Sequence, residues 1–195
     1  MEIGKLNERI SILTPTLSDP FGWEKSCDIW ASCEQSDKPN LFSKVGIGAR
    51  SVSFVIRKRS LSLHDAVLWR SKHCFLTSIT DDGKMALKVV AALVKPVSCF
   101  AWRSVKTRNE YGTPEYLPQL LCSFTGFLTE KYQGFSQQEP QGVVEHRMVL
   151  TTPKAVLLKA GDTVKAGTQD SYTVRVCYLA DEFKNEYEIT DRKEP

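Results

Sequence analysis

The residues best suited to chemistry gather in one stretch, SLHDAVLWRSKHCFLTSI, which holds two of the three histidines, an aspartate and a cysteine. His64 precedes Asp65, and His73 precedes Cys74. Such side chains could bind a metal ion, or pair a thiol nucleophile with an imidazole base. Adjacent strand residues point to opposite faces, however, so His73 and Cys74 cannot easily hydrogen-bond. The third histidine, His146, lies far away in the sequence, and we expect no metal site here.

A β-hairpin explains the same stretch better. Apolar residues alternate up to Trp69, a polar corner follows at residues 70–73, and a second apolar run extends from Cys74 to Ile79. A period of two interrupted by a short polar break is typical of two strands joined by a tight turn. The sequence therefore predicts strands here rather than a catalytic site.

No other motif indicates catalysis. The chain lacks the patterns GxxxxGK(S/T), GxGxxG, HExxH and GxSxG, which mark phosphate loops, dinucleotide sites, zinc proteases and serine hydrolases. Its six cysteines form no CxxC pair, and most lie in apolar runs, where a thiol behaves as a small buried hydrophobe. We predict that the protein is not an enzyme and that it holds no metal ion or cofactor.

Composition narrows the function classes further. Hydrophobic residues make up 42% and charged residues 25% of the 195 residues, as in a folded domain. No apolar run is long enough for a membrane-spanning helix, and the N-terminus has no apolar signal-peptide core. We therefore expect a protein that is made in the cytoplasm and has no membrane partner. The net charge of +3 is too small to indicate a nucleic-acid binder by itself.

Strands dominate the predicted secondary structure, because most apolar residues alternate with polar ones. Gly83, after two aspartates, is expected to supply the positive φ of a hairpin turn. Many short strands with close turns predict an all-β fold, in which a small β-barrel is joined to a second barrel-like domain. The predicted strands are residues 9–13, 51–57, 66–69, 74–79, 86–93, 146–152, 163–166, 172–179 and 187–190.

Two polar stretches suggest how the domains are divided. Residues 34–50 have no clear period, and we expect them to form a long mobile loop. Residues 99–118 are rich in polar side chains, glycine and proline, and we expect them to link the domains. The first domain would then span residues 1–98 and the second residues 119–195.

The second half of the chain repeats the order of features in the first. An alternating strand and a basic polar break lead to an aspartate, Asp65 in the first half and Asp162 in the second. A short strand follows each aspartate, and an aromatic residue, Phe75 or Tyr172, opens the next strand. The sequence identity between the halves is low, so this pattern predicts either an internal duplication of a small barrel or a chance likeness between two β domains.

Three motifs of the first half occur in a recognisable order. The chain opens with G-x-L-x-x-R-I at residues 4–10, has Trp30-Ala31 near the end of the second strand, and has F-x-I-R at residues 54–57. Over about residues 1–95 this order resembles the head–tail joining proteins of tailed bacteriophages, also called head-closure or stopper proteins.

The resemblance implies a structural virion protein of the phage neck, made in the host cytoplasm and assembled at the head–tail interface. Such a protein forms a ring, a dodecamer or alternatively a hexamer, below the portal and its adaptor. The ring closes the DNA channel after packaging and provides the surface on which the tail docks. The implied partners are the portal or adaptor ring, tail-terminator or tail-tube proteins, other copies of the chain, and packaged DNA through non-specific contacts.

The resemblance also places the loop after the second strand in the channel or against the neighbouring ring. Its basic residues Lys38, Lys44 and Arg50 could approach DNA phosphates, by an attraction that salt weakens. The alternative is that these three side chains only keep an exposed loop soluble. Whether the loop would plug the channel or clamp a neighbour is open.

A second basic cluster, Arg57, Lys58 and Arg59, ends the F-x-I-R strand. It could form intersubunit ion pairs or contact an acidic adaptor, or it could only blunt an exposed strand edge. Alternation should place Arg57 and Arg59 on one face and Lys58 on the other. We expect Trp23 and Trp30 to be anchors of the core or of an interface.

Two features depart from the resemblance. The turn at residues 70–73 has no glycine or asparagine, and a typical family member is roughly half as long as this chain. The second domain is therefore additional and could decorate the ring or contact the tail. The alternatives are a tail terminator or another neck subunit and, from another class, a single-stranded nucleic-acid-binding protein of the OB type. The OB alternative predicts exposed aromatic residues beside basic residues on one sheet face.

Overall fold

The chain forms two compact β units, which confirms the predicted all-β class. All named elements of the computed structural model are strands. The first unit consists of Met1–Leu17 and Gly22–Pro96, and the second of Ser18–Phe21 and Val97–Pro195. None of the described residues belongs to a helix that could cross a membrane. The described residues are 6–40, 42, 43, 46, 48–131, 147–167 and 170–191, without the side chains of residues 37 and 170.

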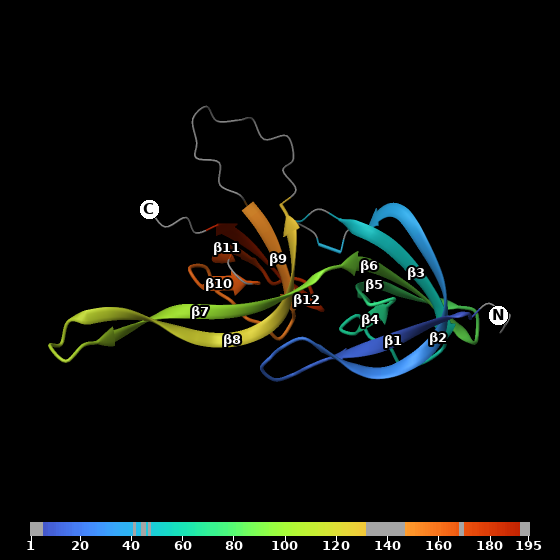
Figure 1. The fold of residues 1–195 in the computed structure, drawn as a ribbon, viewed down its shortest axis with the longest axis horizontal. Coiled ribbons are helices and arrows are strands. Elements are labelled where there is room, and N and C mark those ends of the chain that lie inside the picture. The colour runs from blue at the N-terminus through green and yellow to red at the C-terminus, as the bar shows by residue number, and fades with distance from the viewer. Residues whose placement is uncertain are drawn as a thin grey trace, which may run out of the picture. The chain divides into compact units, whose positions relative to one another are not determined.

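The first unit is a closed barrel of antiparallel strands, in the circular order β1-β2-β3-β6-β5-β4 (Figure 1). Every second side chain of β3 is buried along most of its length, because alternate side chains point into the barrel. The strands are β1 (Glu8–Pro15), β2 (Trp23–Asn40), β3 (Ala49–Arg57), β4 (Ala66–Trp69), β5 (Lys72–Asp82) and β6 (Ala86–Val94).

Apolar side chains from all six strands fill the first barrel. Phe54 and Val52 are 0% exposed, and Ile10, Ile56 and Val67 are 1% exposed. Full burial of one such side chain contributes about 1.5–3 kcal/mol relative to leaving it in water. The barrel is therefore a stable support for the side chains on its outer surface.

The stretch with the histidines is a hairpin, as predicted. β4 and β5 are joined by a two-residue turn in which Arg70 has φ 48° and Ser71 has φ 61°. Two consecutive positive φ values define the tight turn whose twist matches that of the flanking strands. The turn forms without glycine or asparagine. Its Arg70 side chain hydrogen-bonds to the carboxylate of Glu8 and lies 4.8 Å from the centre of the Trp69 ring.

The second unit is also a closed barrel, in the circular order β10-β11-β12-β9-β8-β7. Its core includes Tyr187, whose hydroxyl donates to the carbonyl of Val156 at 2.7 Å and accepts from the N–H of Leu158 at 3.1 Å. The early residues Ser18–Phe21 belong to this unit, since Phe21 forms a parallel bridge with Phe124. The strands are β7 (Pro96–Arg108), β8 (Pro114–Glu130), β9 (Arg147–Pro153), β10 (Thr163–Ala166), β11 (Asp170–Tyr178) and β12 (Lys184–Asp191).

The two barrels have the same topology. Replacing each strand of the first barrel by the strand six places later in the chain converts its circular order into that of the second. The repeat predicted from the sequence is therefore present in the arrangement of the strands.

The two predicted aspartates occupy equivalent positions in this repeat. The carboxylate of Asp65 accepts the N–H of Ser62 at 2.8 Å just before β4, and that of Asp162 accepts the N–H of Lys159 at 2.7 Å just before β10. The predicted aromatic residues do not open their strands, because β5 begins at Lys72 and β11 begins at Asp170. In the strand registers, Phe75 pairs with the residue after Asp65, and Thr173 pairs with the residue after Asp162.

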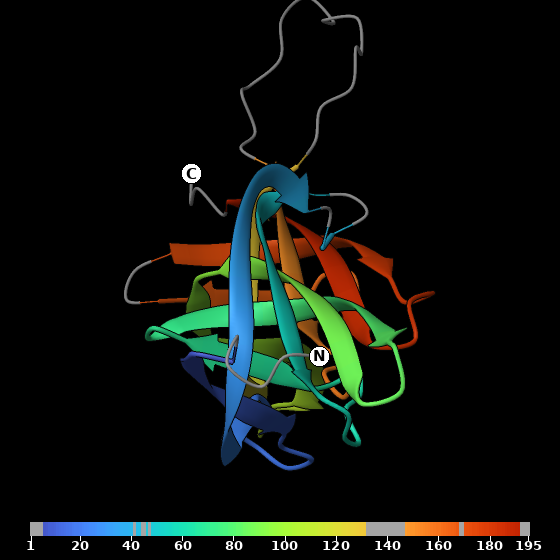
Figure 2. The ribbon, with the colours of Figure 1, turned by 90° about the vertical axis from the view of Figure 1, so that its right-hand side faces the viewer.

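The prediction of a long loop at residues 34–50 is wrong. β2 continues to Asn40 and β3 begins at Ala49, so most of this stretch is paired strand, and Figure 2 shows the two strands as a long curved pair. Phe42, between them, is only 3% exposed and contacts Phe75, with ring centres 6.0 Å apart. Polar strand residues that face water carry no apolar period, which is why the pattern suggested a loop.

The prediction of a linker at residues 99–118 is also wrong. β7 and the first part of β8 occupy this stretch and form a hairpin that extends from the second barrel (Figure 1). Nearly all side chains of its outer part are exposed, so it shows neither the alternation of a half-buried strand nor a core. The first unit ends at Pro96, close to the predicted boundary at residue 98.

Candidate functional site: a basic pocket in the first barrel

An open pocket of about 530 Å³ lies on the first unit. Among the described residues, it combines three apolar side chains with three cationic ones. These lining residues are Leu6, Ile29, Trp30, Arg57, Lys58 and Arg59. This set includes all three members of the second basic cluster predicted from the sequence.

Strand pairing explains why Trp30 faces outward. Its neighbour Ala31 is 0% exposed and points into the barrel, so Trp30 points away from the core and is 59% exposed. Arg9 of β1 pairs directly with Trp30, and Ala31 pairs with Ile56 of β3. Arg57 follows Ile56, which places it next to Trp30 on the other side.

The three sequence motifs meet at this place. Leu6 and Arg9 come from the G-x-L-x-x-R-I motif, Trp30 from the W-A motif and Arg57 from the F-x-I-R motif. Leu6, Trp30 and Arg57 line the pocket, and Arg9 pairs with Trp30 in the strand register. Residues separated by about twenty positions or more in the sequence thus form one surface.

Arg57 and Arg59 are the cations available to a ligand. Among the described residues, neither forms an ion pair with a carboxylate, whereas Lys58 pairs with Asp81 at 2.7 Å. The guanidinium of Arg59 lies 3.1 Å from the sulfur of Cys27, which leaves its charge uncompensated. Two arginines beside an exposed indole can bind carboxylates or phosphates together with an apolar or aromatic group.

Arg9, by contrast, is held by Asp28. The Arg9 guanidinium donates to the Asp28 carboxylate at 2.9 Å, which also accepts from Lys25 and from the hydroxyl of Ser11 at 2.6 Å. Hydrogen bonds from Lys25 and Ser11, with the charges of Lys25 and Arg9, lower the pKa of Asp28 to about 2. Asp28 therefore stays ionised at neutral pH and neutralises part of the charge beside the pocket.

The predicted placement of the second basic cluster is partly corrected. Arg57 and Arg59 line one surface as expected, but Lys58 lines the same pocket and not the opposite face. Alternation fails because β3 ends at Arg57, so Lys58 and Arg59 are outside the strand. At Lys58 the chain turns toward the β5–β6 connection, where its N–H donates to the carbonyl of Met85 at 2.9 Å.

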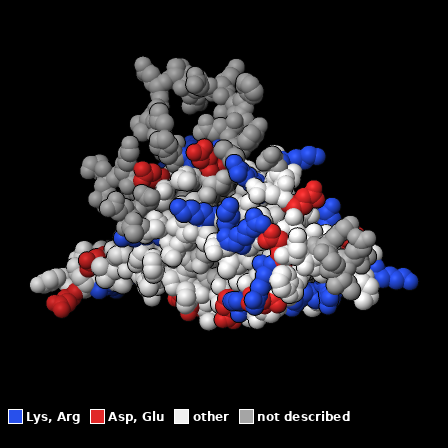
Figure 3. Space-filling view, turned by 45° about the vertical axis from the view of Figure 1, so that its right-hand side comes forward, with Lys and Arg blue, Asp and Glu red and all other residues white. Residues whose placement is uncertain are grey.

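The first basic cluster lies elsewhere on the first unit. Lys38 is an exposed residue of β2, and Arg50 is an exposed residue of β3 that pairs with Pro39, the residue after Lys38. These two cations are therefore close together, but on strands and not in a loop. Lys44 lies outside the described residues. Acidic side chains occur among the basic ones on the face that Figure 3 shows.

Trp23 and the nearby histidine have structural roles. The Trp23 indole N–H donates to the carbonyl of His64 at 2.9 Å, and its ring contacts that of His73, with centres 5.2 Å apart. His73 is 8% exposed, and this burial lowers its pKa to about 4. His73 is therefore neutral at physiological pH. Trp23 is half-buried and packs against His73 and Phe75, so it anchors the edge of the core.

The cysteines are free thiols throughout the chain. Burial raises the pKa of Cys33, Cys74 and Cys99 to about 12, so these thiols remain protonated and poorly nucleophilic. Within the part of the chain that the structure describes, no group of three or more His, Cys, Asp or Glu residues could hold a metal ion.

Sequence reasoning missed the apolar part of the pocket, which Leu6 and Ile29 provide. Leu6 belongs to the opening motif and Ile29 precedes Trp30, so a signal was present. Only the strand pairing shows, however, that these positions meet beside the arginines.

Comparison of the chain with protein-family models, with curated proteins and with solved structures found no match.

Proposed function

We propose that the protein is a structural component of the phage neck, which forms a ring below the portal or its adaptor. The ring closes the DNA channel after packaging and carries the surface on which the tail docks. One observation carries this proposal. The three motifs that resemble head-closure proteins converge on one exposed pocket, where Leu6, Trp30 and Arg57 are neighbours.

The pocket suits attachment better than catalysis. It offers an exposed aromatic ring and two arginines that form no ion pair with a described carboxylate, the residue types that dominate binding energy at protein interfaces. An acidic, partly apolar segment of a neighbouring protein would complement it. In the neck, that neighbour is another ring or another copy of this chain.

Substitutions in the pocket test the proposal. A variant chain, with either Trp30→Ala or Arg57→Ala, is produced in infected cells. The infecting phage carries an early stop codon in its own copy of this gene. Both side chains are exposed, so the variants should keep the melting temperature of the wild type. A hot-spot loss of about 2 kcal/mol weakens attachment roughly thirtyfold, so the yield of infectious particles should fall strongly.

Lys72→Ala is the matched control, because it removes an exposed cation from another part of the same barrel. It should restore the wild-type yield. If the Trp30 and Arg57 variants restored that yield as well, the pocket would not be the attachment site.

A second candidate function has one specific observation in its favour. Phe100 and Trp102 are two residues apart on β7, with ring centres 6.1 Å apart, and Phe100 is 41% exposed. Lys165 of β10 pairs with Phe100 and is exposed on the same face. This is the combination of aromatic and basic residues that single-stranded nucleic acids bind.

The fold argues against the OB type for this second candidate. Each barrel has six strands, whereas an OB fold has five. Binding of a fluorescent oligonucleotide, measured at low and high salt, distinguishes the two functions. Tight, salt-sensitive binding that is lost in Phe100→Ala would favour the nucleic-acid function.

A further inference from the structure

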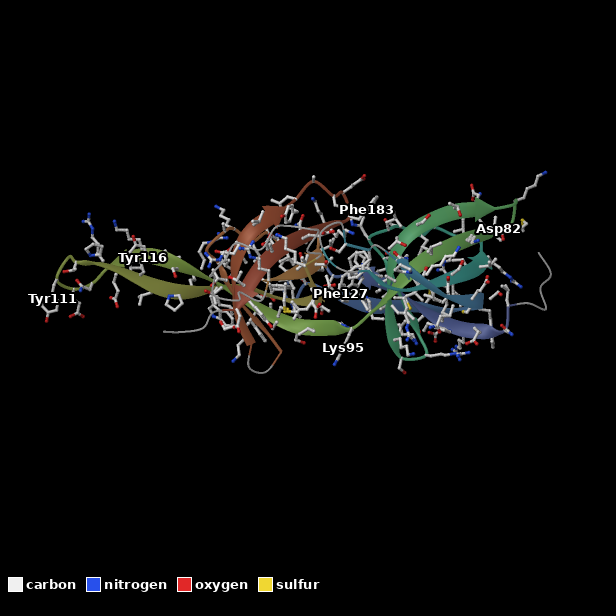
Figure 4. The ribbon with its side chains drawn as sticks, turned by 90° about the horizontal axis from the view of Figure 1, so that it is seen from above. Asp82, Lys95, Tyr111, Tyr116, Phe127 and Phe183 are labelled. Carbon is white, nitrogen blue, oxygen red and sulfur yellow. The ribbon has the colours of Figure 1, made fainter. Side chains whose placement is uncertain are left out.

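The hairpin of β7 and β8 extends beyond the second barrel as an exposed arm, which we define as residues 104–120. Figure 4 shows Tyr111 and Tyr116 on this outer part of the hairpin. Tyr111 is 90% exposed and Tyr116 is 66% exposed, while Leu117 and Leu120 are 48% and 53% exposed. Such large apolar side chains on one projecting element are typical of an interaction surface.

The tip of the arm has a defined shape. The side-chain oxygen of Asn109 accepts the N–H groups of Tyr111 at 3.1 Å and of Thr113 at 2.9 Å. Gly112 adopts φ 75°, and its N–H donates to the carbonyl of Asn109 at 2.9 Å. A tip ordered in this way loses little conformational freedom when it binds a partner.

A two-stranded ribbon by itself is only marginally stable in water. The arm nevertheless forms, with its strands bonded out to Asn109 and Thr113. A partner that covers its aromatic side chains would stabilise it. The structure therefore raises the question of which surface complements the arm.

We propose that the arm tip of one copy binds in the basic pocket of a second copy. The tip carries Glu110 and Glu115, exposed carboxylates that form no ion pair with any other described residue, beside the exposed rings of Tyr111 and Tyr116. The pocket carries uncompensated arginines beside an exposed indole. The carboxylates and rings of the tip thus meet the arginines and the indole of the pocket, which is electrostatic complementarity. The basic residues of the arm, Lys106 and Arg108, precede the tip.

Such a contact joins different surfaces of two identical chains. Contacts of this heterologous kind produce closed rings when the rotation between copies closes, and open filaments when it does not. The inference rests on the proposed function for the choice of a closed ring. The contact between arm and pocket itself requires no phage particle.

Photo-crosslinking of the full-length chain tests the contact. A photoreactive phenylalanine analogue replaces Tyr111, and the purified protein is irradiated over the micromolar concentration range. We expect covalent dimers whose crosslinked peptides contain Trp30 or residues 57–59. The control places the same analogue at Leu157, which is 67% exposed, and should give no such peptides. Crosslinks confined to one chain, crosslinks to other surfaces, or the absence of dimers would overturn the inference.

Charge reversal tests the same contact independently. Arg57→Glu with Arg59→Glu should lower the yield of dimers about tenfold or more, as should Glu110→Arg with Glu115→Arg. A chain with all four changes should recover the dimers to within about twofold of wild type, because the reversed charges again attract. Failure of the combined variant to recover would contradict docking between these two surfaces.

The failure of this inference and that of the proposed function are distinguishable. If the chain joins heads to tails but gives no crosslink, the proposed function stands and the arm–pocket contact is wrong. If the chain gives the crosslinked dimers but is dispensable for head–tail joining, the contact stands and the proposed neck function is wrong.

Discussion

The role of a single side chain in this protein depends on the residues beside it. Arg57 and Arg59 could be recognised in the sequence as a basic cluster, but the sequence left open whether they bind anything. The structure places them beside Trp30, which is 59% exposed although tryptophan usually buries most of its surface. An exposed tryptophan between arginines is costly to leave in water, and this is the reason to treat the pocket as an interface.

His73 allows a test of the first barrel's core at the residue scale. Burial lowers its pKa from the ordinary 6.5 to about 4, so protonation favours the unfolded chain. The stabilising effect of the neutral ring is therefore complete above pH 6.5 and is lost as the pH falls toward 4. From this shift the loss is on the order of 3 kcal/mol.

The measurement compares the wild type with His73→Gln. Urea unfolding of both proteins at several pH values between 4 and 7.5 gives the difference in unfolding free energy. That difference should shrink as the pH falls, because only the wild type contains the titrating ring. Parallel pH profiles for the two proteins would contradict a depressed pKa at His73.

At the scale of elements, the two aspartates before β4 and β10 mark the repeat, but they have different surroundings. The carboxylate of Asp65 accepts the backbone N–H of Ser62, which lies three residues earlier in the same turn. Asp162 is 2% exposed and accepts the backbone N–H of Lys159 and two hydrogen bonds from Arg103, at 2.8 and 2.7 Å. The second barrel thus adds an ion pair, between a buried carboxylate and a half-buried arginine, to a turn that both barrels share.

Alanine substitutions should reveal this difference. Asp65→Ala loses one hydrogen bond and should cost about 1 kcal/mol. Asp162→Ala leaves Arg103 without its carboxylate in a mostly buried place and should cost roughly 3 kcal/mol, with faster hydrogen exchange in β10. Asp82→Ala, at the exposed end of β5, is the control and should stay within about 0.5 kcal/mol of wild type. Equal costs for Asp65 and Asp162 would mean that the ion pair adds no stability.

The same scale shows what the sequence could and could not predict. The strands around Ile10 and Phe54 were predictable, because mainly one face of each is buried and apolar residues therefore recur at alternate positions. The outer parts of β2, β7 and β8 were not, because side chains exposed on both faces need no apolar period. Glycine and proline near the arm's tip strengthened the misinterpretation as a linker, although such residues equally serve a hairpin turn.

The candidate site, too, could be predicted from the sequence only in part. The arginines were visible as a run of charge, and Trp30 was visible as part of a motif. Their meeting depends on the pairing of β1, β2 and β3, which is a long-range property of the barrel. The tyrosines of the arm gave no signal at all, since nothing in a short polar segment shows that it projects from a barrel.

At the scale of the whole molecule, two barrels of one topology provide two different surfaces. The first barrel presents the basic pocket, and the second extends the arm that carries acidic and aromatic residues. The proposed contact between these two surfaces would let copies of the chain assemble, as a ring protein of the phage neck must do. The second barrel, which the resemblance leaves unexplained, would then have a role in holding the ring together.

Electron microscopy of a lysate tests the neck function most directly. The proposed function requires the gene to belong to a tailed phage. In that phage an early stop codon is introduced into the gene, and the particles are examined by negative staining. The proposal predicts emptied heads beside separate, complete tails, and restoration of joined particles when the chain is supplied from a plasmid. Joined particles with DNA-filled heads in the absence of the protein would contradict a role at the head–tail junction.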